Sequence, residues 1–277
     1  MKTDPVGRAS SPLAAFSVHG KPRPTCVREN LVAEEANLDQ TTADAWHCLV
    51  DGPHSGAFNM ALDEALLEAA PALGQPLLRF YEWTEPAATF GYFQAYAEVA
   101  RLTALRPLVR RPTGGGLVPH DRDYTYTLVV PPTHDWYRLR ARDSYRRVHD
   151  WLRHAFGRLG WQTELASIAR VEGPGQCFVG AEQFDVLWQG AKIAGAAQRR
   201  TRSGLLIQGS LQPPSGAPAR GAWQEAMRKV AEQHWSVRWR TFVVPAIVLD
   251  RAEQLATGKY GHAGYNQRKA MGSDPYY

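Results

Sequence analysis

The stretch FDVLWQGAKIAGAAQRRTRSGLLIQGSL, residues 184–211, decides the fold class of this chain. It holds three apolar runs of the length and composition typical of β-strands, at 184–188, 192–198 and 205–211. Gln189-Gly190 and Arg202-Ser203-Gly204 separate these runs and contain residues that favour tight turns. Because tight turns join antiparallel neighbours, the stretch predicts a meander of strands within a larger sheet.

Elements on either side of this stretch alternate irregularly between strands and helices. Runs rich in aromatic and β-branched residues predict strands at 45–51, 77–81, 88–92, 108–111 and 124–130. Apolar residues three and four apart predict helices over 58–69, ended by Pro71, over 145–159, ended by Gly160, and around 227–231. The order indicates an α+β fold with a mixed or antiparallel sheet flanked by helices.

The first 44 residues differ from the rest of the chain. They are rich in Ser, Pro, Gly, Asn and Glu and show no sustained apolar period, so we expect residues 1–44 to form a disordered or poorly ordered extension. Residues 45–277 show one composition and no internal repeat. They predict a single domain of catalytic size.

Composition limits the class of protein. With 277 residues, 44% of them hydrophobic, the chain can bury a sizeable core, and it contains neither a long apolar run nor a signal-peptide pattern. Its three cysteines, Cys26, Cys48 and Cys177, are too scattered for a disulfide framework or a zinc site. We therefore expect a cytoplasmic protein with no membrane segment and no bound metal. The net charge of +5 leaves an acidic partner open.

A glycine-rich loop is the first candidate binding element. Arg110-Arg111-Pro112-Thr113-Gly114-Gly115-Gly116 follows an apolar strand and precedes another that contains His120. Glycines let the backbone approach a ligand closely, and guanidinium groups can bind a phosphate or carboxylate. A ligand loop is one interpretation, and a glycine-rich hairpin turn with two solvent-facing arginines is the other.

Lys192 is the second candidate. The chain has six lysines, and Lys192 is the only one between Lys21 and Lys229, in a strand of small residues, Gly190-Ala191-Lys192-Ile193-Ala194-Gly195. A compact ammonium group in an arginine-rich chain suggests a site where a guanidinium would not fit, although a surface lysine remains an alternative. Asn59 and Asp63, taken alone, are interpreted as helix caps.

Taken together, these segments resemble the lipoate–protein ligase and octanoyltransferase family, which is related to the biotin protein ligases. Each match is weak alone, but their common order is specific, and the resemblance covers roughly residues 45 to 270. The matching segments are 59–63 (NMALD), 78–83 (LRFYEW), 90–94 (FGYFQ), 110–116 (RRPTGGG), 120–121 (HD), 125–127 (TYT), 184–185 (FD) and 190–195 (GAKIAG).

The resemblance implies an α+β catalytic domain that passes a C8 acyl group, octanoyl or lipoyl, to a lysine of a lipoyl domain. Lys192 would be catalytic, because an ammonium beside the activated carbonyl stabilises negative charge that develops on oxygen. The resemblance places these residues at the acyl and phosphate pocket: Arg110, Arg111, Thr113, Gly114, Gly115, Gly116, His120, Gly195 and Ala196.

Within this family two chemistries remain open. Octanoyltransferases need no cofactor and carry the acyl group on a cysteine, and Cys177 stands at the spacing before Lys192 that one branch uses. Ligases activate lipoate with ATP and Mg²⁺. Because the sequence ends soon after Lys259, we expect no ligase accessory domain, whereas the third glycine of the loop, Gly116, is a feature that resembles the ligases. We favour transfer through a Cys177 thioester, although Cys177 could also be a small buried residue.

The implied partners are lipoyl domains of 2-oxoacid dehydrogenase or glycine cleavage complexes, and acyl carrier protein as donor. Residues 199–202 (RRTR) could dock such acidic proteins. A non-catalytic nucleic-acid or regulatory module is a distant alternative, which the positive charge, the same basic run and the many tryptophans could support. We expect no nucleic-acid partner, because basic residues elsewhere alternate with acidic ones.

Overall fold

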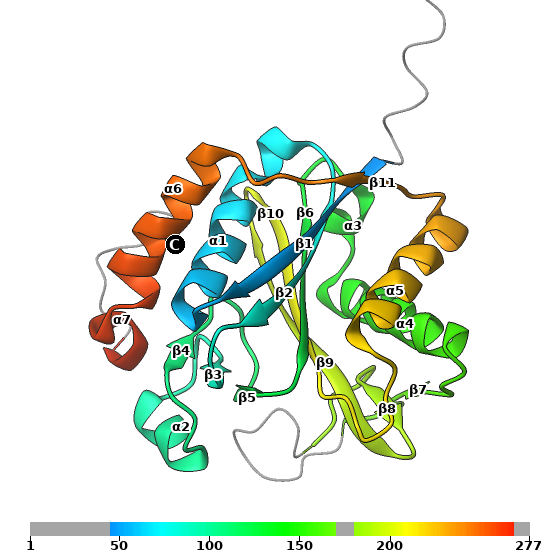
Figure 1. Ribbon diagram of the computed structural model, residues 1–277, viewed down its shortest axis with the longest axis horizontal. Helices are drawn as coiled ribbons and strands as arrows, with labels where there is room; N and C mark the ends of the chain where they lie inside the picture. The colour runs from blue at the N-terminus through cyan, green and yellow to red at the C-terminus, as the bar shows by residue number, and fades with distance from the viewer. Residues whose placement is uncertain (1–44, 170–179, 269–277) are drawn as a thin grey trace, which may run out of the picture. The chain divides into compact units, whose positions relative to one another are not determined.

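The computed structural model describes residues 45–169 and 180–268, and its centre is an eight-stranded sheet (Figure 1). In spatial order its strands are β11 (Arg238–Thr241), β1 (Ala45–His54), β2 (Leu77–Trp83), β6 (Tyr124–Val130), β10 (Gly204–Leu211), β9 (Ala191–Thr201), β8 (Val186–Trp188) and β7 (Glu164–Leu165). Only the pairs of β1 with β11 and with β2 are parallel. All other pairs in this sheet are antiparallel, so the sheet is mixed.

The predicted meander forms one end of this sheet. β8, β9 and β10 are consecutive antiparallel neighbours. Gln189 and Gly190 join β8 to β9 with φ angles of 51° and 78°. Two successive positive φ angles are typical of the hairpin turns whose twist matches that of the flanking strands. The predicted turn is therefore confirmed.

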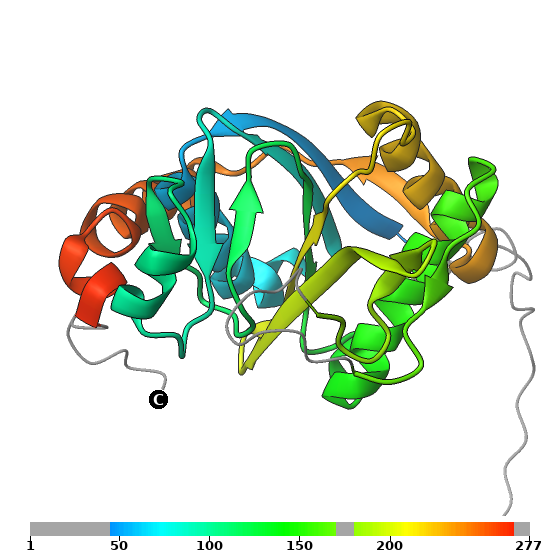
Figure 2. The ribbon, with the colours of Figure 1, turned by 90° about the horizontal axis from the view of Figure 1, so that it is seen from below.

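Helices cover both faces of the sheet (Figure 2). α4 (Ala141–Arg158) and α5 (Arg220–Trp235), with the short α3 (Asp135–Arg138), pack against one face. α1 (Gly56–Leu73), α6 (Ala246–Leu255) and the single π-turn η1 (Ala256–Tyr260) pack against the other. β6 explains how one strand serves both layers: Tyr126, Leu128 and Val130 join the α4–α5 core, and Val129 joins the α1–α6 core.

A second, three-stranded sheet holds the segments on either side of the glycine-rich loop. Its order is β4 (Leu108–Arg110), β3 (Ala87–Phe90) and β5 (Val118–His120). α2 (Tyr96–Leu102) and α7 (Ala263–Arg268) contact each other, and α7 also contacts β4. The predicted α+β fold, a mixed sheet flanked by helices, is confirmed.

The predicted end of the first helix is wrong. α1 continues through Pro71 to Leu73, and Gly74, with φ of 67°, donates its backbone N–H to the Ala70 carbonyl. A proline in the last turn removes one hydrogen bond from a helix end, and the left-handed glycine cap then satisfies a terminal carbonyl. The helix therefore ends at the glycine and not at the proline.

Two sequence expectations fall outside the described residues. The N-terminal extension, residues 1–44, and Cys177 lie there, so both stay predictions. Among the residues that the structure describes, no helix has the length and apolar character needed to cross a membrane.

Candidate functional site

Lys192 and Asp185 form an ion pair at the start of β9. Lys192 Nζ lies 2.8 Å from Asp185 Oδ2, and the lysine side chain is 7% exposed. Tyr145 of α4 donates its hydroxyl to Asp185 Oδ1 at 2.5 Å, and the backbone N–H of Glu182 donates to Asp185 Oδ2 at 2.6 Å. A carboxylate held by these donors fixes the position of the ammonium group.

Gly195 makes room for this pair. A Cβ atom on Gly195 would lie 2.9 Å from Lys192 Cε, closer than real Cβ contacts come, and 3.1 Å from Asp185 Oδ1, which is tighter than most such contacts. The next residue, Ala196, directs its backbone N–H toward the Tyr145 hydroxyl at 3.4 Å. A side chain on Gly195 would therefore displace the lysine or its counter-ion.

The glycine-rich loop lies directly against the end of β3. A Cβ atom on Gly91 would stand 1.9 Å from the carbonyl oxygen of Gly115, and the Tyr92 backbone N–H donates to the Thr113 carbonyl at 2.8 Å. Gly115 has a φ of 85°, which L side chains rarely adopt. Close backbone approach therefore fixes the path of residues 113–116.

The two predicted binding arginines hold the loop through backbone carbonyls. Arg110, 1% exposed, donates to the carbonyls of Tyr92, Gln94 and Asn266 at 2.7, 2.7 and 2.8 Å. Arg111, 4% exposed, donates to the carbonyls of Gly114 and Gly116, both at 2.7 Å. Both guanidinium groups build the loop in this structure, and direct acyl or phosphate binding by them stays a prediction.

Thr113 connects the loop to the main sheet. Its hydroxyl donates to Gln208 Oε1 at 2.8 Å, and Gln208 Nε2 donates to Asp63 Oδ2 at 2.7 Å. In the β9–β10 pairing, Gln208 lies opposite Ala197, and Ser210 lies opposite Gly195. Residues two apart on a strand share a face, so Gln208 and Gly195 belong to one face of the sheet. A Cβ on Gly195 would lie against Lys192 Cε, so the Lys192 side chain reaches the face of the sheet on which Gln208 binds Thr113.

Asn59 and Asp63 are not helix caps, and that interpretation is corrected. Ser55 caps α1, whereas Asn59 and Asp63 are fully buried, and each accepts a 2.7 Å hydrogen bond from Arg79 of β2. Thr127 also donates to Asp63, at 2.7 Å. These residues form a buried polar network beneath the loop. A helix-start pattern could not reveal it, because the partners come from other strands.

His120 is held by both ring nitrogens. Nδ1 lies 2.8 Å from Asp123 Oδ2, Nε2 lies 2.8 Å from the Thr89 hydroxyl, and the ring stacks on Trp83 at 3.8 Å between centroids. With both nitrogens occupied, His120 contributes to the site by positioning β5 in this conformation. Its predicted contact with substrate stays a prediction.

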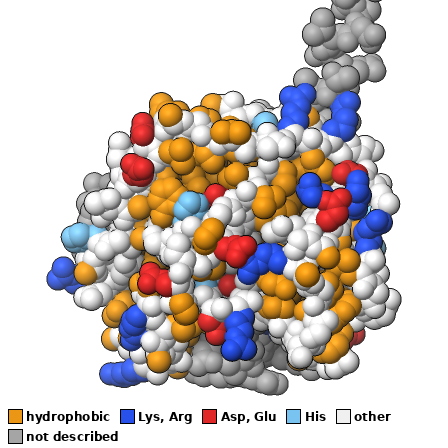
Figure 3. Space-filling view, viewed as in Figure 1, with side chains coloured by type: hydrophobic (Ala, Val, Ile, Leu, Met, Phe, Trp, Pro, Cys, Tyr) orange, Lys and Arg blue, Asp and Glu red, His pale blue; other side chains and the backbone are white. Residues whose placement is uncertain are grey.

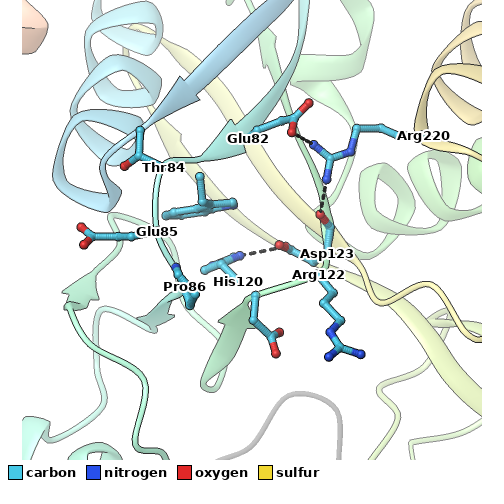
Figure 4. Close-up of a pocket in the computed structure, with 10 residues that line it drawn as sticks. Glu82, Thr84, Glu85, Pro86, His120, Arg122, Asp123 and Arg220 are labelled. Carbon is cyan, nitrogen blue, oxygen red and sulfur yellow. Dashed lines mark hydrogen bonds and ion pairs between the residues drawn. The ribbon is translucent and has the colours of Figure 1, made fainter.

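A pocket of about 210 Å³ opens beside His120 (Figure 4). Carboxylates and arginines dominate its lining, which is Glu82, Trp83, Thr84, Glu85, Pro86, His120, Asp121, Arg122, Asp123 and Arg220. Arg220 closes one side, because it pairs with Glu82 at 2.5 Å and donates to the Asp123 carbonyl at 3.2 Å. Such a charged lining does not suit an apolar C8 chain, so we do not assign the acyl group to this pocket.

Two buried side chains next to Asp185 keep defined protonation states. Burial, and then the Asp185 carboxylate, raise the pKa of Tyr145 well above its usual value, so it remains a proton donor to Asp185. Burial lowers the pKa of His149 to about 4, and its ring nitrogen Nδ1 lies 3.1 Å from the Tyr145 carbonyl. His149 is therefore neutral near pH 7 and donates to that carbonyl.

Cysteine chemistry at this site depends on Cys177, which lies outside the described residues. Cys48 is buried, and burial raises the pKa of its thiol, so it is a poor nucleophile. Within the described ranges, no three His, Cys, Asp or Glu side chains come together in a way that could hold a metal ion.

Sequence reasoning missed several residues that complete the site. Asp185 was visible only as part of the Phe184-Asp185 match, and Tyr145 only as an apolar position of a helix. Gln208 was not singled out, although a glutamine in an otherwise apolar strand is a signal that could have found it, because a buried amide needs partners.

Comparison with known proteins identifies the family. A family model described as the lipoyl protein ligase A/B catalytic domain matches residues 55–213. The chain is 35% identical over 179 residues to the octanoyltransferase LipM of Kyrpidia tusciae, a match that covers 60% of this chain and 65% of that protein. It is 32% identical over 181 residues to LipM of Brevibacillus brevis, covering 61% and 66%. The match thus spans somewhat less than two thirds of these relatives.

Solved structures share the fold at low sequence identity. Lipoate-protein ligase A bound with ATP has a TM-score of 0.68 at 19% identity, covering 80% of this chain and 98% of that one. A bipartite lipoate protein ligase of Thermoplasma acidophilum, analysed with its E2 lipoyl domain, has a TM-score of 0.65 at 18% identity, covering 83% and 99%. Since the family model covers more than half of the chain, the chain belongs to the lipoyl protein ligase A/B catalytic domain family.

Proposed function

We propose that this protein transfers an octanoyl group to the lysine of a lipoyl domain, with Lys192 as the charge-stabilising group and Cys177 as the acyl carrier. The observation that carries the proposal is the buried Lys192–Asp185 pair, which lies against Gly195 on β9, next to the strand whose Gln208 binds the glycine-rich loop. A fixed ammonium in a water-poor place is the group that a developing oxyanion needs. The names of the LipM relatives support octanoyl transfer.

The first half-reaction loads the enzyme. The thiolate of Cys177 attacks the carbonyl of an octanoyl thioester on acyl carrier protein, and negative charge collects on the carbonyl oxygen beside the Lys192 ammonium. Collapse of this intermediate breaks the bond to the donor sulfur. The donor leaves as a thiolate and takes up a proton from solvent, and octanoyl remains on Cys177 as a thioester.

The second half-reaction unloads it. The neutral ε-amine of the lipoyl-domain lysine attacks the Cys177 thioester, and the same ammonium stabilises the second oxyanion. The amide forms, the amine loses its proton to solvent, and Cys177 returns as a thiolate. A thiolate suits both steps because it attacks well near neutral pH and also leaves readily.

Asp185 and Tyr145 have a positioning role in this scheme. Asp185 holds the ammonium in place at 2.8 Å, and Tyr145 occupies the other carboxylate oxygen. With Oδ1 engaged by Tyr145, the carboxylate keeps one orientation, and the ammonium stays over Gly195. Neither residue needs to change its protonation state during the reaction.

The acceptor is proposed to be a lipoyl domain. The archaeal ligase of similar fold was analysed together with its E2 lipoyl domain, which supports this choice of acceptor. Lipoyl domains of 2-oxoacid dehydrogenase or glycine cleavage complexes both present a lysine of the required kind. The same assay can compare the two.

The deciding experiment compares two donors and two cysteine variants. Purified wild type, Cys177→Ser and the control Cys48→Ala are each incubated with a lipoyl domain, once with octanoyl-acyl carrier protein and once with octanoate, ATP and Mg²⁺. The mass of the lipoyl domain reports transfer. We expect wild type and Cys48→Ala to use the carrier-bound donor and Cys177→Ser to be inactive, because a serine hydroxyl lacks the acidity of a thiol.

A trapped intermediate gives an independent check. Wild type mixed with the carrier-bound donor alone should hold a hydroxylamine-sensitive octanoyl adduct on the peptide that contains Cys177. Activity that requires ATP and survives Cys177→Ser would replace the transferase by a ligase that activates the free acid, because an acyl-adenylate needs no protein nucleophile.

A further inference from the structure

A group of arginines gathers around the start of α4. Residues 135–147 and 200–202 contain seven exposed arginines and two exposed aspartates. The arginines are Arg138, Arg140, Arg142, Arg146, Arg147, Arg200 and Arg202, and we call them the arginine surface. The whole chain carries a net charge of only +5. On the face drawn in Figure 3, by contrast, basic and acidic side chains are interspersed.

Most members of the arginine surface have no acidic partner within the described residues. Arg138 pairs with Asp135 at 3.5 Å, and both of these side chains are largely exposed. The other six form no ion pair with any carboxylate among residues 45–169 and 180–268. Four of them lie over aromatic rings instead, Arg142 and Arg146 over Phe184, Arg147 over Trp136 and Arg200 over Tyr137. Their charge therefore remains available to a partner.

The surface is one continuous region because the β9–β10 hairpin is bound to α3 and α4. The Gln198 side chain donates to the Ala141 carbonyl at 2.6 Å and accepts from the Ser144 hydroxyl at 2.8 Å. Farther along the hairpin, the Tyr137 hydroxyl donates to the Thr201 carbonyl at 2.9 Å. These contacts hold Arg200 and Arg202 next to the arginines of α3 and α4.

Phe184 connects the arginine surface to the Lys192–Asp185 pair, because it contacts two of the arginines and precedes Asp185 in the chain. The guanidinium carbons of Arg142 and Arg146 lie 5.3 and 5.6 Å from the centre of the Phe184 ring. Phe184 has a φ of 76°, a strained value for a bulky residue. The next residue is Asp185, the counter-ion of Lys192. The backbone conformation of Phe184 thus places its ring under Arg142 and Arg146. It also directs the next residue, Asp185, to Lys192.

From this placement we infer that the arginine surface docks the acyl donor, an acidic carrier protein whose thioester hangs on a phosphate-bearing arm. Guanidinium pairs bind phosphate and carboxylate groups, and a surface of one sign steers an oppositely charged protein during association. The inference rests on the proposed function, since it assigns the donor's binding place for the same reaction.

Charge separates the donor from the other candidate partners. Both partners are expected to be acidic proteins, but only the donor also carries a phosphate beside its acyl group, where the acceptor carries a lysine, and guanidinium pairs bind a phosphate. Single-stranded nucleic acid binds by stacking bases on open aromatic faces. Here guanidinium groups already lie over Phe184, Trp136 and Tyr137. The carrier protein is therefore the partner that this surface fits.

The test reverses two charges beside the site. Arg142→Glu/Arg146→Glu is compared with wild type and with the control Arg238→Glu/Arg240→Glu, which makes the same charge change on β11 at the opposite end of the sheet. Each enzyme is assayed with octanoyl-acyl carrier protein and with octanoyl-N-acetylcysteamine, a small thioester without phosphate or protein. The lipoyl-domain concentration is also varied.

We expect kcat/KM for the carrier-bound donor to fall about tenfold or more in the α4 variant at low salt, and the loss to shrink as salt rises. Transfer from the small thioester, the KM for the lipoyl domain and the control variant should stay at wild-type values. An equal loss with both donors would overturn the inference and assign the arginines to the chemical step. A raised KM for the lipoyl domain would assign the surface to the acceptor, and no loss at all would leave it without a docking role. Wild type that uses neither thioester would instead reject the proposed function.

Discussion

Lys192 is closely packed against Gly195 and its counter-ion Asp185. Its Cε would lie 2.9 Å from a Cβ on Gly195, and its Nζ lies 2.8 Å from Asp185. We expect Lys192→Arg to lower kcat by about two orders of magnitude although the charge is kept, because the planar fork displaces the charge from the reacting oxygen. Steady-state transfer of octanoyl is the measurement, and Lys229→Arg on the surface of α5 is the control. A kcat of Lys192→Arg within a few-fold of wild type would show that Lys192 does not stabilise the reacting oxygen and behaves as an ordinary surface lysine.

His149 makes the stability of the fold depend on pH. It is buried without a hydrogen-bond partner at Nε2 within the described residues, and its pKa falls from 6.5 to about 4 because of burial. Between pH 6.5 and pH 4 the imidazole is protonated in the unfolded chain but stays neutral in the folded chain. The neutral, buried imidazole therefore costs no stability above pH 6.5. As the pH falls toward 4, the free energy of unfolding decreases by about 3 kcal/mol in all.

Replacing this histidine isolates its effect. We expect the free energy of unfolding of His149→Phe to fall less than that of wild type between pH 7 and pH 4.5, because phenylalanine cannot take up a proton. Urea titrations at the two pH values measure the difference, with the exposed His234→Gln as control. If wild type and His149→Phe lose equal stability on acidification, the buried imidazole is not the titrating group.

At the scale of elements, the end of β3 supports the glycine-rich loop through backbone contact. Gly91→Ala would put a methyl group 1.9 Å from the Gly115 carbonyl oxygen, so residues 113–116 must move. Overpacking of this kind costs about 1 to 3 kcal/mol of stability, and a displaced loop should also lower transfer activity. Gly114→Ala is the stability control, because no described atom lies within 4 Å of its Cβ position. Thermal unfolding and the transfer assay test this, and a Gly91→Ala protein as stable as Gly114→Ala and as active as wild type would contradict it.

Strands and turns were predictable where local rules decide them. The run 124–130 was predicted as a strand and is observed as β6 with the same bounds. Its residues are apolar or β-branched on both faces, and helices cover both. The turn at Gln189-Gly190 was equally local, because Gly190, which accepts positive φ without steric cost, stands between two apolar runs.

Polar side chains were predictable in kind but not in role. Asn59 and Asp63 match a helix start, yet both bind Arg79, which lies 20 and 16 residues farther along the chain. Local patterns cannot show which polar groups will be buried together, because the partner depends on the packing of α1 on β2. Lys192 could be singled out by its small neighbours. Its counter-ion Asp185 could not, because the ion pair arises only when the chain turns back between β8 and β9.

At the scale of the whole molecule, the hydrophobic clusters of the described residues indicate which part of the chain contributes to the core. Among the described ranges, the buried members of the three hydrophobic clusters run from Trp46 to Tyr265. β1 lies between β11 and β2 and supplies Trp46 and Cys48 to the α4–α5 core. Within the described ranges the cores therefore begin with β1, and we predict that the part of the chain that the fold requires begins there.

Two truncations test this boundary. A chain that begins at Thr42 keeps all of β1, and we expect it to unfold at the same temperature as the full chain and to transfer octanoyl at the same rate. A chain that begins at Gly52 loses most of β1, which exposes the edge of β2 and leaves a cavity where Trp46 packed, so it should fail to fold. Differential scanning calorimetry and the transfer assay measure both. If the chain from Thr42 folds but transfers no octanoyl, residues 1–41 take part in the reaction or in partner binding. The N-terminal extension would then be a functional element and could not be deleted without loss of activity.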